Sequence, residues 1–306
     1  MKIKEKVQAY LEYCEFRKEL DSKTLKAYRI DIRQYFEFIE SDDPVKEEIE
    51  KYITDLHKKF KQKTVKRKLA SVKAFYNYLE EEEIIADSPF RKIKVKFKEN
   101  VQLPRIIPKN EIEQLLNFMY RHMDADNEKR RGQKLRDVAV VEVFFATGAR
   151  VYEISNLRWD CINLESGLMR IMGKGGKERY IQIGDQDIIY LLKEYYKENE
   201  AAIKKQGYFF VNKRGSRFTE QSIRAMVKKY TCLAGIERHI TPHMFRHSFA
   251  TYLIEEGVDV SCVQQILGHS SIKTTQIYIH IAVAVQTKIL KEFHPRKKMR
   301  IIGLAA

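Results

Sequence analysis

A tyrosine near the end of the chain follows a series of basic side chains with which it could cleave a phosphodiester bond. Tyr278 ends the run LGHSSIKTTQIY, at residues 267–278. The runs ATGAR, MGKGGKERY and TPHMFRHSFAT precede it in this order. Together these runs contribute two guanidiniums, an amine and two imidazoles upstream of the phenol: Arg150, Arg246, Lys174, His243 and His269. Such a set predicts a phosphate site that carries its own nucleophile.

The chemistry of these residue types suggests a role for each. A phenol has a pKa of about 10, so Tyr278 needs cationic surroundings to attack as a phenolate. Attack by a hydroxyl on a phosphodiester passes through a pentacoordinate phosphorane, whose extra negative charge two arginines and a histidine can neutralise. A lysine can protonate the leaving 5′-oxygen as general acid. The covalent phosphotyrosine would conserve the bond energy, so we expect rejoining without ATP, without a metal ion and without a cofactor.

The spacing within these runs indicates how the groups are held. His243 and Arg246 are three residues apart and share one face of a helix, while Phe245 lies on another face, toward a core. Glu153 follows Arg150 by three residues, a spacing that lets its carboxylate orient the guanidinium.

Each run also has a simpler interpretation. HxxR occurs on ordinary surface helices. Residues 258–278 could form a helix-turn-helix, with Val260–Leu267 as its first helix, Ser271 capping the second and Tyr278 merely packing. The glycines around Lys174 do not form GxxxxGK[ST], so nucleotide binding is not predicted. A DNA-binding protein without catalysis is therefore the alternative to an enzyme.

Composition favours a folded protein with a polyanionic partner. The 306 residues suffice for two domains, and 44% of them are hydrophobic. Lys and Arg exceed Asp and Glu by 57 to 42, which gives a net charge of +15. Eight basic residues and no acid lie between Asp55 and Glu80. The basic surface is thus expected to include part of the first domain.

The four cysteines form no CxxC pair, and this argues against a zinc site. The start MKIKEKVQAY has no apolar segment of signal-peptide length, and no apolar run approaches the ~18 residues of a membrane span. We therefore expect a cytoplasmic protein that does not bind membranes.

The first ninety residues show the apolar spacing of helices. Four are predicted, which together make a small bundle: Val7–Leu20, Ser22–Ile39, a helix from Pro44 to about Phe60, and Thr64–Leu79. Asp43 is the expected N-cap of the third helix. The solvent face of the fourth helix carries Lys63, Lys66, Arg67 and Lys73.

The basic and apolar residues of RKIKVKFK alternate at 91–98, which suggests an extended basic linker. Beyond it, the pattern predicts a mixed α/β domain with a small β-sheet. Its expected elements are a helix at 111–121, a polar loop at 122–134, an apolar helix at 137–146, strands at 168–172 and 179–183, a short strand at 209–211, and otherwise helices. The whole chain is thus mainly α.

The quoted runs resemble those of the tyrosine recombinases, or integrase family, and especially of its short Xer-like members. The matching pieces are TGAR, GKGGKER, TPHMFRHSFAT, LGHSSIKTTQIY and HPR, and the resemblance spans nearly the whole chain. Ala149 and Tyr152 depart from the commoner leucine and serine, but no departure removes a catalytic group. The resemblance implies a helical, SAM-like core-binding domain at 1–98, a linker at 99–107 and a catalytic domain at 108–306.

The resemblance also implies individual roles. Arg150 and Arg246 would bind the scissile phosphate, and Lys174 would protonate the 5′-hydroxyl. His243 would assist proton transfer from the nucleophile, His269 would hydrogen-bond the phosphate, and Tyr278 would form the 3′-phosphotyrosine.

The implied partner is double-stranded DNA that carries recombination sites. A homotetramer, alone or with a second recombinase or an accessory protein, would join two duplexes through a Holliday junction. Residues 282–306 would pack on a neighbouring subunit. The residues expected to face DNA are Lys63, Lys66, Arg67, Lys73, Arg91, Lys92, Lys94 and Lys96. A type IB topoisomerase uses a similar set of groups, but the Xer-like bundle and the tail argue against it.

Overall fold

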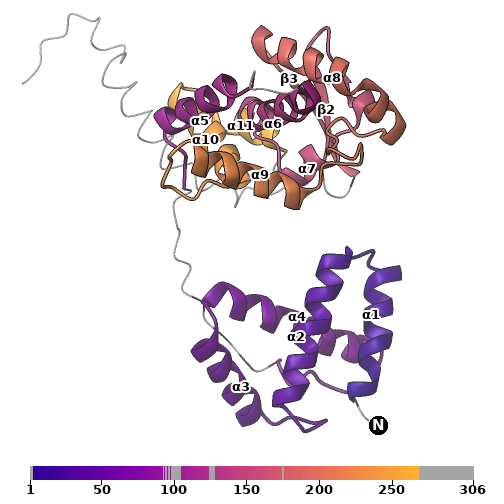
Figure 1. Cartoon of the computed structure of the whole chain (residues 1–306). Helices are drawn as coiled ribbons and strands as arrows, with labels where there is room; N and C mark the ends of the chain where they lie inside the picture. The colour runs from indigo at the N-terminus through magenta and orange to yellow at the C-terminus, as the bar shows by residue number, and fades with distance from the viewer. Residues whose placement is uncertain are drawn as a thin grey trace, which may run out of the picture. The chain divides into compact units, whose positions relative to one another are not determined.

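The computed structural model describes residues 3–91, 93, 95, 97, 105–123, 128–173 and 176–268. The chain divides into two compact units, Met1–Asn100 and Val101–Ala306 (Figure 1). Each unit has its own hydrophobic core. In the described part of the chain, no helix has the length and apolar character that a membrane crossing requires.

The first unit is a bundle of four α-helices, as the apolar spacing predicted. A short 3-10 helix precedes them, and the elements in order are η1 (Ile3–Lys6), α1 (Val7–Phe16), α2 (Ser22–Phe38), α3 (Lys46–Lys59) and α4 (Gln62–Glu81). Helix α4 contacts the other three α-helices, so its apolar face supplies the centre of the core. Phe75 and Leu79 of α4 are fully buried there, together with Tyr35 of α2.

Two expected boundaries in this bundle are wrong. Helix α1 ends at Phe16, four residues before the predicted Leu20. Helix α3 begins at Lys46, and Val45 is its N-cap in place of Asp43. The reason for the second difference is the carboxylate of Glu48, whose Oε2 accepts a hydrogen bond from the Val45 N–H at 3.0 Å and so satisfies the cap from inside the first turn.

A buried carboxylate joins α2 to α4. Asp31 is 0% exposed and accepts hydrogen bonds from Lys68 Nζ at 3.1 Å and Ser71 Oγ at 2.8 Å. The guanidinium of Arg67 also pairs with Asp31, while about half of the Arg67 side chain stays exposed. Charged partners compensate the desolvation of this carboxylate.

Apolar residues after α4 complete the first core. Phe90 and Ile93 are buried in it, and Val95 and Phe97 pack against it. The alternation in the run at 91–98 therefore reflects packing of every second side chain on the bundle.

The second unit is built around one apolar helix. Its helical elements are α5 (Lys109–Arg121), α6 (Glu128–Thr147), α7 (Val151–Ser155), the 3-10 helix η2 (Trp159–Cys161), α8 (Gln186–Gln206), α9 (Glu220–Leu233), α10 (Pro242–Glu255) and α11 (Val260–Leu267). Helices α5, α8, α9 and α10 all contact α6 (Figure 1). The segment from Val138 to Phe144 is buried, so α6 forms the centre of this core.

A three-stranded antiparallel sheet adjoins these helices. It consists of β1 (Ile162–Asn163), β2 (Leu168–Met172) and β3 (Glu178–Gln182), in that order. Ile171 of β2 lies opposite Arg179 of β3. Met169, Ile171 and Ile181 are buried, so one face of the sheet belongs to the core. The mainly helical fold with a small sheet is thus as predicted.

Two local expectations in this unit are wrong. The polar stretch at 122–134 was expected to be a loop, but α6 begins within it, at Glu128. Residues 209–211 form no strand; only isolated bridges occur nearby. The hydroxyl of Tyr195 donates to the Phe209 carbonyl and accepts from the Val211 N–H, both at 3.0 Å. The Phe209 N–H donates to the Leu157 carbonyl and the Phe210 carbonyl accepts from the Phe218 N–H, so the partners of this backbone are divided and no ladder forms.

Candidate active site

The run ATGAR forms a tight turn between α6 and α7. Gly148 has φ +58°, and a Cβ there would lie 2.6 Å from Phe249 and 2.7 Å from Leu267, so only glycine fits. The hydroxyl of Thr147 accepts a hydrogen bond from the Ala149 N–H at 3.2 Å. Arg150 then occupies the N-cap position of α7. The turn thus fixes the backbone from which the Arg150 side chain extends.

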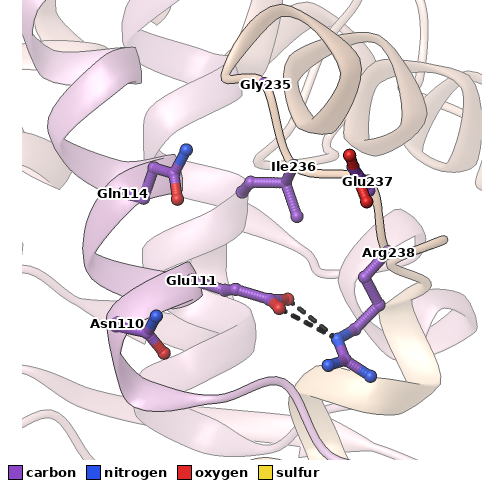
Figure 2. A pocket seen from close by; sticks show the side chains of 7 residues that line it. All are labelled: Asn110, Glu111, Gln114, Gly235, Ile236, Glu237 and Arg238. Atoms are coloured by element: carbon purple, nitrogen blue, oxygen red, sulfur yellow. Dashed lines mark hydrogen bonds and ion pairs between the residues drawn. The ribbon is translucent and has the colours of Figure 1, made fainter.

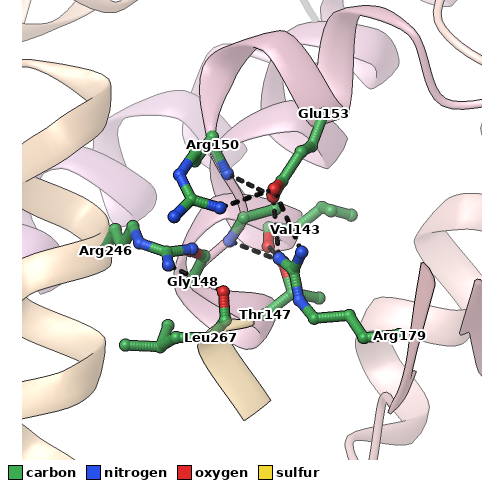
Figure 3. A network of polar contacts seen from close by, with 9 residues as sticks. Val143, Thr147, Gly148, Arg150, Glu153, Arg179, Arg246 and Leu267 are labelled. Atoms are coloured by element: carbon green, nitrogen blue, oxygen red, sulfur yellow. Dashed lines mark hydrogen bonds and ion pairs between the residues drawn. The ribbon is translucent and has the colours of Figure 1, made fainter. Parts of the chain in front are cut away.

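The carboxylate of Glu153 binds two arginines (Figure 3). Its Oε2 accepts from the Arg150 N–H at 2.8 Å and its Oε1 from Arg150 Nη1 at 2.9 Å. Arg179, on β3, donates in parallel from Nη1 to Oε1 at 3.0 Å and from Nη2 to Oε2 at 2.7 Å. The Glu153 side chain is 1% exposed and that of Arg179 10%, whereas that of Arg150 is 37% exposed. Arg150 is therefore the member of this group that a ligand can reach.

The electrostatics of the group favour an anion. Burial raises the pKa of Glu153, but the hydrogen bonds and charges of Arg179 and Arg150 outweigh it, so the pKa lies below its usual value. With the carboxylate ionised, Arg150, Arg179 and Arg246 carry three positive charges against one negative charge. A phosphate at this place would meet an excess of positive charge in partly desolvated surroundings.

Arg246 is held by the main chain. Its Nη1 donates to the Gly148 carbonyl at 2.8 Å and its Nη2 to the Leu267 carbonyl at 2.7 Å (Figure 3). The residue is only 5% exposed. Because a guanidinium has five N–H donors, these two bonds set its plane and use two of the five.

His243 lies in the first turn of α10, three residues before Arg246. Thr241 is the N-cap of this helix and Pro242 its first residue. Loss of solvation lowers the pKa of His243, and the charges of Arg224, Arg246 and Arg150 lower it further, against a smaller effect of Glu220. An imidazole with a lowered pKa is neutral near pH 7 and can accept a proton.

Three of the six predicted catalytic groups are therefore described, and they come together: Arg150, Arg246 and His243. Lys174, His269 and Tyr278 lie outside the described residues. The described residues directly before Lys174 and His269 lie close to the arginine cluster. A Cβ on Gly173 would be 3.8 Å from Glu153 Oε1, and one on Gly268 would be 3.1 Å from Arg179 Cδ.

Arg179 is the residue of this group to which the sequence analysis gave no role. It alternates with exposed neighbours on β3 and shares the core face with Ile181, which is 6% exposed. An arginine on the inward face of a short strand needs a buried acid as partner. That signal was present in GKGGKERYIQI, but the partner could not be identified without the fold.

The residues of the first unit expected to face DNA differ in their contacts. Lys63 and Lys66 are exposed on α4. Arg67 pairs with buried Asp31, and the Lys73 amine donates to the Ile93 carbonyl at 3.5 Å. Arg91 pairs with acids of its own unit, Asp87 and Glu80. Three further residues of this set are outside the described part: Lys92, Lys94 and Lys96.

A hollow elsewhere in the second unit has a different character. It has a volume of about 530 Å³ and is lined by α5 and by the segment after α9 (Figure 2). Arg238 Nε donates to Glu111 Oε2 at 2.9 Å, and Gln114 Nε2 to the Ala234 carbonyl at 2.8 Å. Its lining includes none of the three clustered arginines, Arg150, Arg179 and Arg246. Within the described ranges, no three His, Cys, Asp or Glu residues are grouped so that they could hold a metal ion.

Comparisons with known proteins agree with this arrangement. Residues 105–284 match the model of the phage integrase family, and residues 7–83 match the phage integrase N-terminal SAM-like domain. A tyrosine recombinase of Agathobacter rectalis is 47% identical over 296 residues, which are 95% of this chain and 96% of that protein. Tyrosine recombinase XerD of Listeria innocua is 32% identical, over 95% of this chain and 98% of the relative.

A solved structure has the same fold. It is the crystal structure of the XerH site-specific recombinase bound to palindromic difH substrate, a post-cleavage complex. The TM-score is 0.73 at 22% identity, and the match covers 94% of this chain and 84% of that one. The chain belongs to the phage integrase family of tyrosine recombinases, which are DNA strand-exchanging enzymes. The family and fold predicted from the motifs are thereby confirmed.

Proposed function

We propose that this protein is a site-specific recombinase that cuts and rejoins DNA through a covalent 3′-phosphotyrosine at Tyr278. The observation that carries the proposal is the grouping of Arg150, Arg246 and His243. Arg150 binds the Glu153 carboxylate, Arg246 binds the Gly148 carbonyl two residues before Arg150, and the charges of both arginines act on His243. Arg150 and Arg246 bind the scissile phosphate and neutralise the charge of the phosphorane.

The reaction is a transfer between two hydroxyls, so it is balanced without hydrolysis. The Tyr278 oxygen forms a bond to phosphorus and gives its proton to neutral His243. The bond from phosphorus to the 5′-oxygen breaks, and Lys174 protonates that oxygen. Attack by a 5′-hydroxyl of a second duplex reverses these steps and releases Tyr278. The number of phosphoester bonds is unchanged, so ATP is not consumed.

His269 donates a hydrogen bond to the phosphate in this proposal. It follows Gly268, which lies against Arg179, and Leu267, whose carbonyl binds Arg246. These two contacts fix the chain directly before His269. They support a place for the imidazole beside the arginines.

The proposed DNA complex uses both units. The bundle at 1–98 contacts the duplex through the basic residues of α4 and of the run at 91–98, a linker at 99–107 follows, and residues 108–306 perform the chemistry. Phosphate contacts of this kind determine affinity and salt dependence more than base preference. Four subunits on two duplexes would exchange strands through a Holliday junction, with residues 282–306 packed on a neighbour.

The test begins by recovering the DNA site. The full chain is incubated, without Mg²⁺ or ATP, with a library of nicked duplexes of randomised centre. The nick lets the cut fragment diffuse away, so covalent adducts accumulate and can be sequenced. Wild type should capture a defined sequence, and Tyr278→Phe should capture none. Equal capture by Tyr278→Phe would overturn the assignment of the nucleophile. Captured DNA without a common sequence would overturn site specificity.

A further inference from the structure

Arg179 connects its own strand to two other segments of the arginine cluster. Through Glu153 it is joined to Arg150, since each carboxylate oxygen accepts one bond from each arginine. Its aliphatic part lies against Gly268, where a Cβ would meet Arg179 Cδ at 3.1 Å. Its own strand, β3, is half of the hairpin that leads to residues 174 and 175.

The contact between Arg179 and Glu153 holds the β2–β3 hairpin against α7. Gly173 closes the hairpin, because its N–H donates to the Lys177 carbonyl at 2.7 Å, and a Cβ on Gly173 would be 3.8 Å from Glu153 Oε1. Arg179 is two residues beyond Lys177 and lies opposite Ile171 in the ladder. The end of the hairpin is therefore fixed relative to Glu153 by two hydrogen bonds from a single side chain.

We infer that Arg179 is a positioning residue for the general acid. Its bidentate bond to Glu153 keeps the hairpin that bears Lys174 in register with the phosphate bound by Arg150. This inference rests on the proposed function of Lys174. Arg179 itself is 90% covered and has both terminal nitrogens on Glu153, so it acts through its neighbours rather than on the phosphate.

The chemistry of the guanidinium explains why lysine would not replace it. Two parallel N–H groups fix both the distance and the angle of the strand to the carboxylate, whereas an ammonium fixes only a distance. A displacement of about 1 Å at a proton donor costs on the order of 10²-fold in rate. The expected loss on substitution is therefore in proton delivery.

The experiment compares two leaving groups. The nicked duplex of the selected sequence is made with an ordinary phosphodiester or with a 5′-bridging phosphorothioate, whose thiolate leaves without a proton. Arg179→Met should cleave the ordinary DNA about 10²-fold more slowly than wild type, and the sulfur-containing DNA within about 10-fold of wild type. Arg179→Lys, which keeps the charge, should show the same pattern with a smaller loss. The control is Arg170→Met, in the same hairpin. Arg170 pairs with Glu178 at 3.5 Å and donates to Cys161 Sγ at 3.5 Å, and neither partner belongs to the arginine cluster. This variant should cleave both duplexes like wild type.

Lys174→Ala separates this inference from the proposed function. If sulfur fails to rescue Lys174→Ala, the assignment of the general acid is wrong. If sulfur rescues Lys174→Ala but neither Arg179 variant, Arg179 supports the phosphate site or the fold, and the inference is overturned. The double variant Arg179→Met with Lys174→Ala should be no slower than Lys174→Ala alone, since both changes affect one proton transfer. Multiplied losses would also overturn the inference.

Discussion

Neutralising Glu153 should lower the free energy of unfolding of the second unit by more than the loss of one ordinary hydrogen bond would. In Glu153→Gln the shape is kept, but the buried Arg179 guanidinium loses its counter-charge and the amide can accept bonds on one atom only. Removing one partner of a buried ion pair costs about 3–5 kcal/mol. Because the Arg150 side chain is 37% exposed and partly solvated, we expect the lower end, about 3 kcal/mol.

The chain provides its own probe for this measurement. Trp159 is the single tryptophan and lies in the second unit, so its fluorescence follows urea unfolding of that unit alone. With a slope of about 2 kcal/mol per M, the midpoint should fall by about 1.5 M. Glu165→Gln is the matched control: Glu165 binds Lys193 at 2.9 Å, but its side chain is 87% exposed, and the change should cost less than about 0.5 kcal/mol. Similar midpoints for the two variants would refute the reasoning.

Low pH should remove the difference in urea midpoint between wild type and Glu153→Gln. The pKa of Glu153 is lowered in the folded protein, so its ionised form contributes full stability above the unfolded pKa of about 4.3. That contribution is lost as the pH falls through the lower folded pKa. The midpoints of wild type and Glu153→Gln should therefore converge below about pH 4, and a difference that stays constant would mean that the carboxylate charge is not its cause.

Three further outcomes are expected. Because the pKa of His243 is lowered, the cleavage rate should rise with pH and reach half its maximum below pH 6.5, and His243→Gln should lose this limb in single-turnover assays between pH 5 and 8. Gly148→Ala places a Cβ 2.6 Å from Phe249 at a φ of +58°, and should lower the urea midpoint and slow cleavage together; unchanged cleavage would show that the Gly148 carbonyl is not needed to orient Arg246. Truncation after residue 285 should abolish strand exchange, measured as recombination of two labelled duplexes, while the free energy of unfolding followed by Trp159 fluorescence stays within about 1 kcal/mol of wild type. Full exchange by the truncated chain would contradict a role for the tail.

Local patterns predicted most of the helices, because apolar spacing reports directly which face of a helix is buried. Helix α10 is an example: the spacing HxxR predicted that His243 and Arg246 share one face of a helix, and both lie on α10 (Pro242–Glu255). One expectation, the strand at 209–211, failed because a distant side chain intervenes. Tyr195 takes two of the backbone hydrogen bonds of these residues, and nothing near them in the sequence announces it.

The spacing of residues along the chain could not predict ion pairs between residues far apart in the sequence. Arg179 meets Glu153 across 26 positions, and Arg67 and Lys68 meet Asp31 across 36 and 37. Each acid lies on an ordinary-looking helical stretch, and only the fold reveals that it is buried. Spacing predicted the bond between Glu153 and Arg150, three residues apart, but not the bond between Glu153 and Arg179.

The main-chain hydrogen bonds of Arg246 leave the sequence around it free to vary at exposed positions. Two of its N–H groups bind the carbonyls of Gly148 and Leu267, and every amino acid supplies a carbonyl. Exposed side chains in the surrounding turns can therefore be exchanged while the plane of the guanidinium is preserved, as long as the backbone path is kept. Tyr152, which is 48% exposed, is such a position, whereas Ala149 is fully buried in the core. Libraries that retarget the enzyme to new DNA can thus randomise such positions, provided that the glycine at 148 is left untouched.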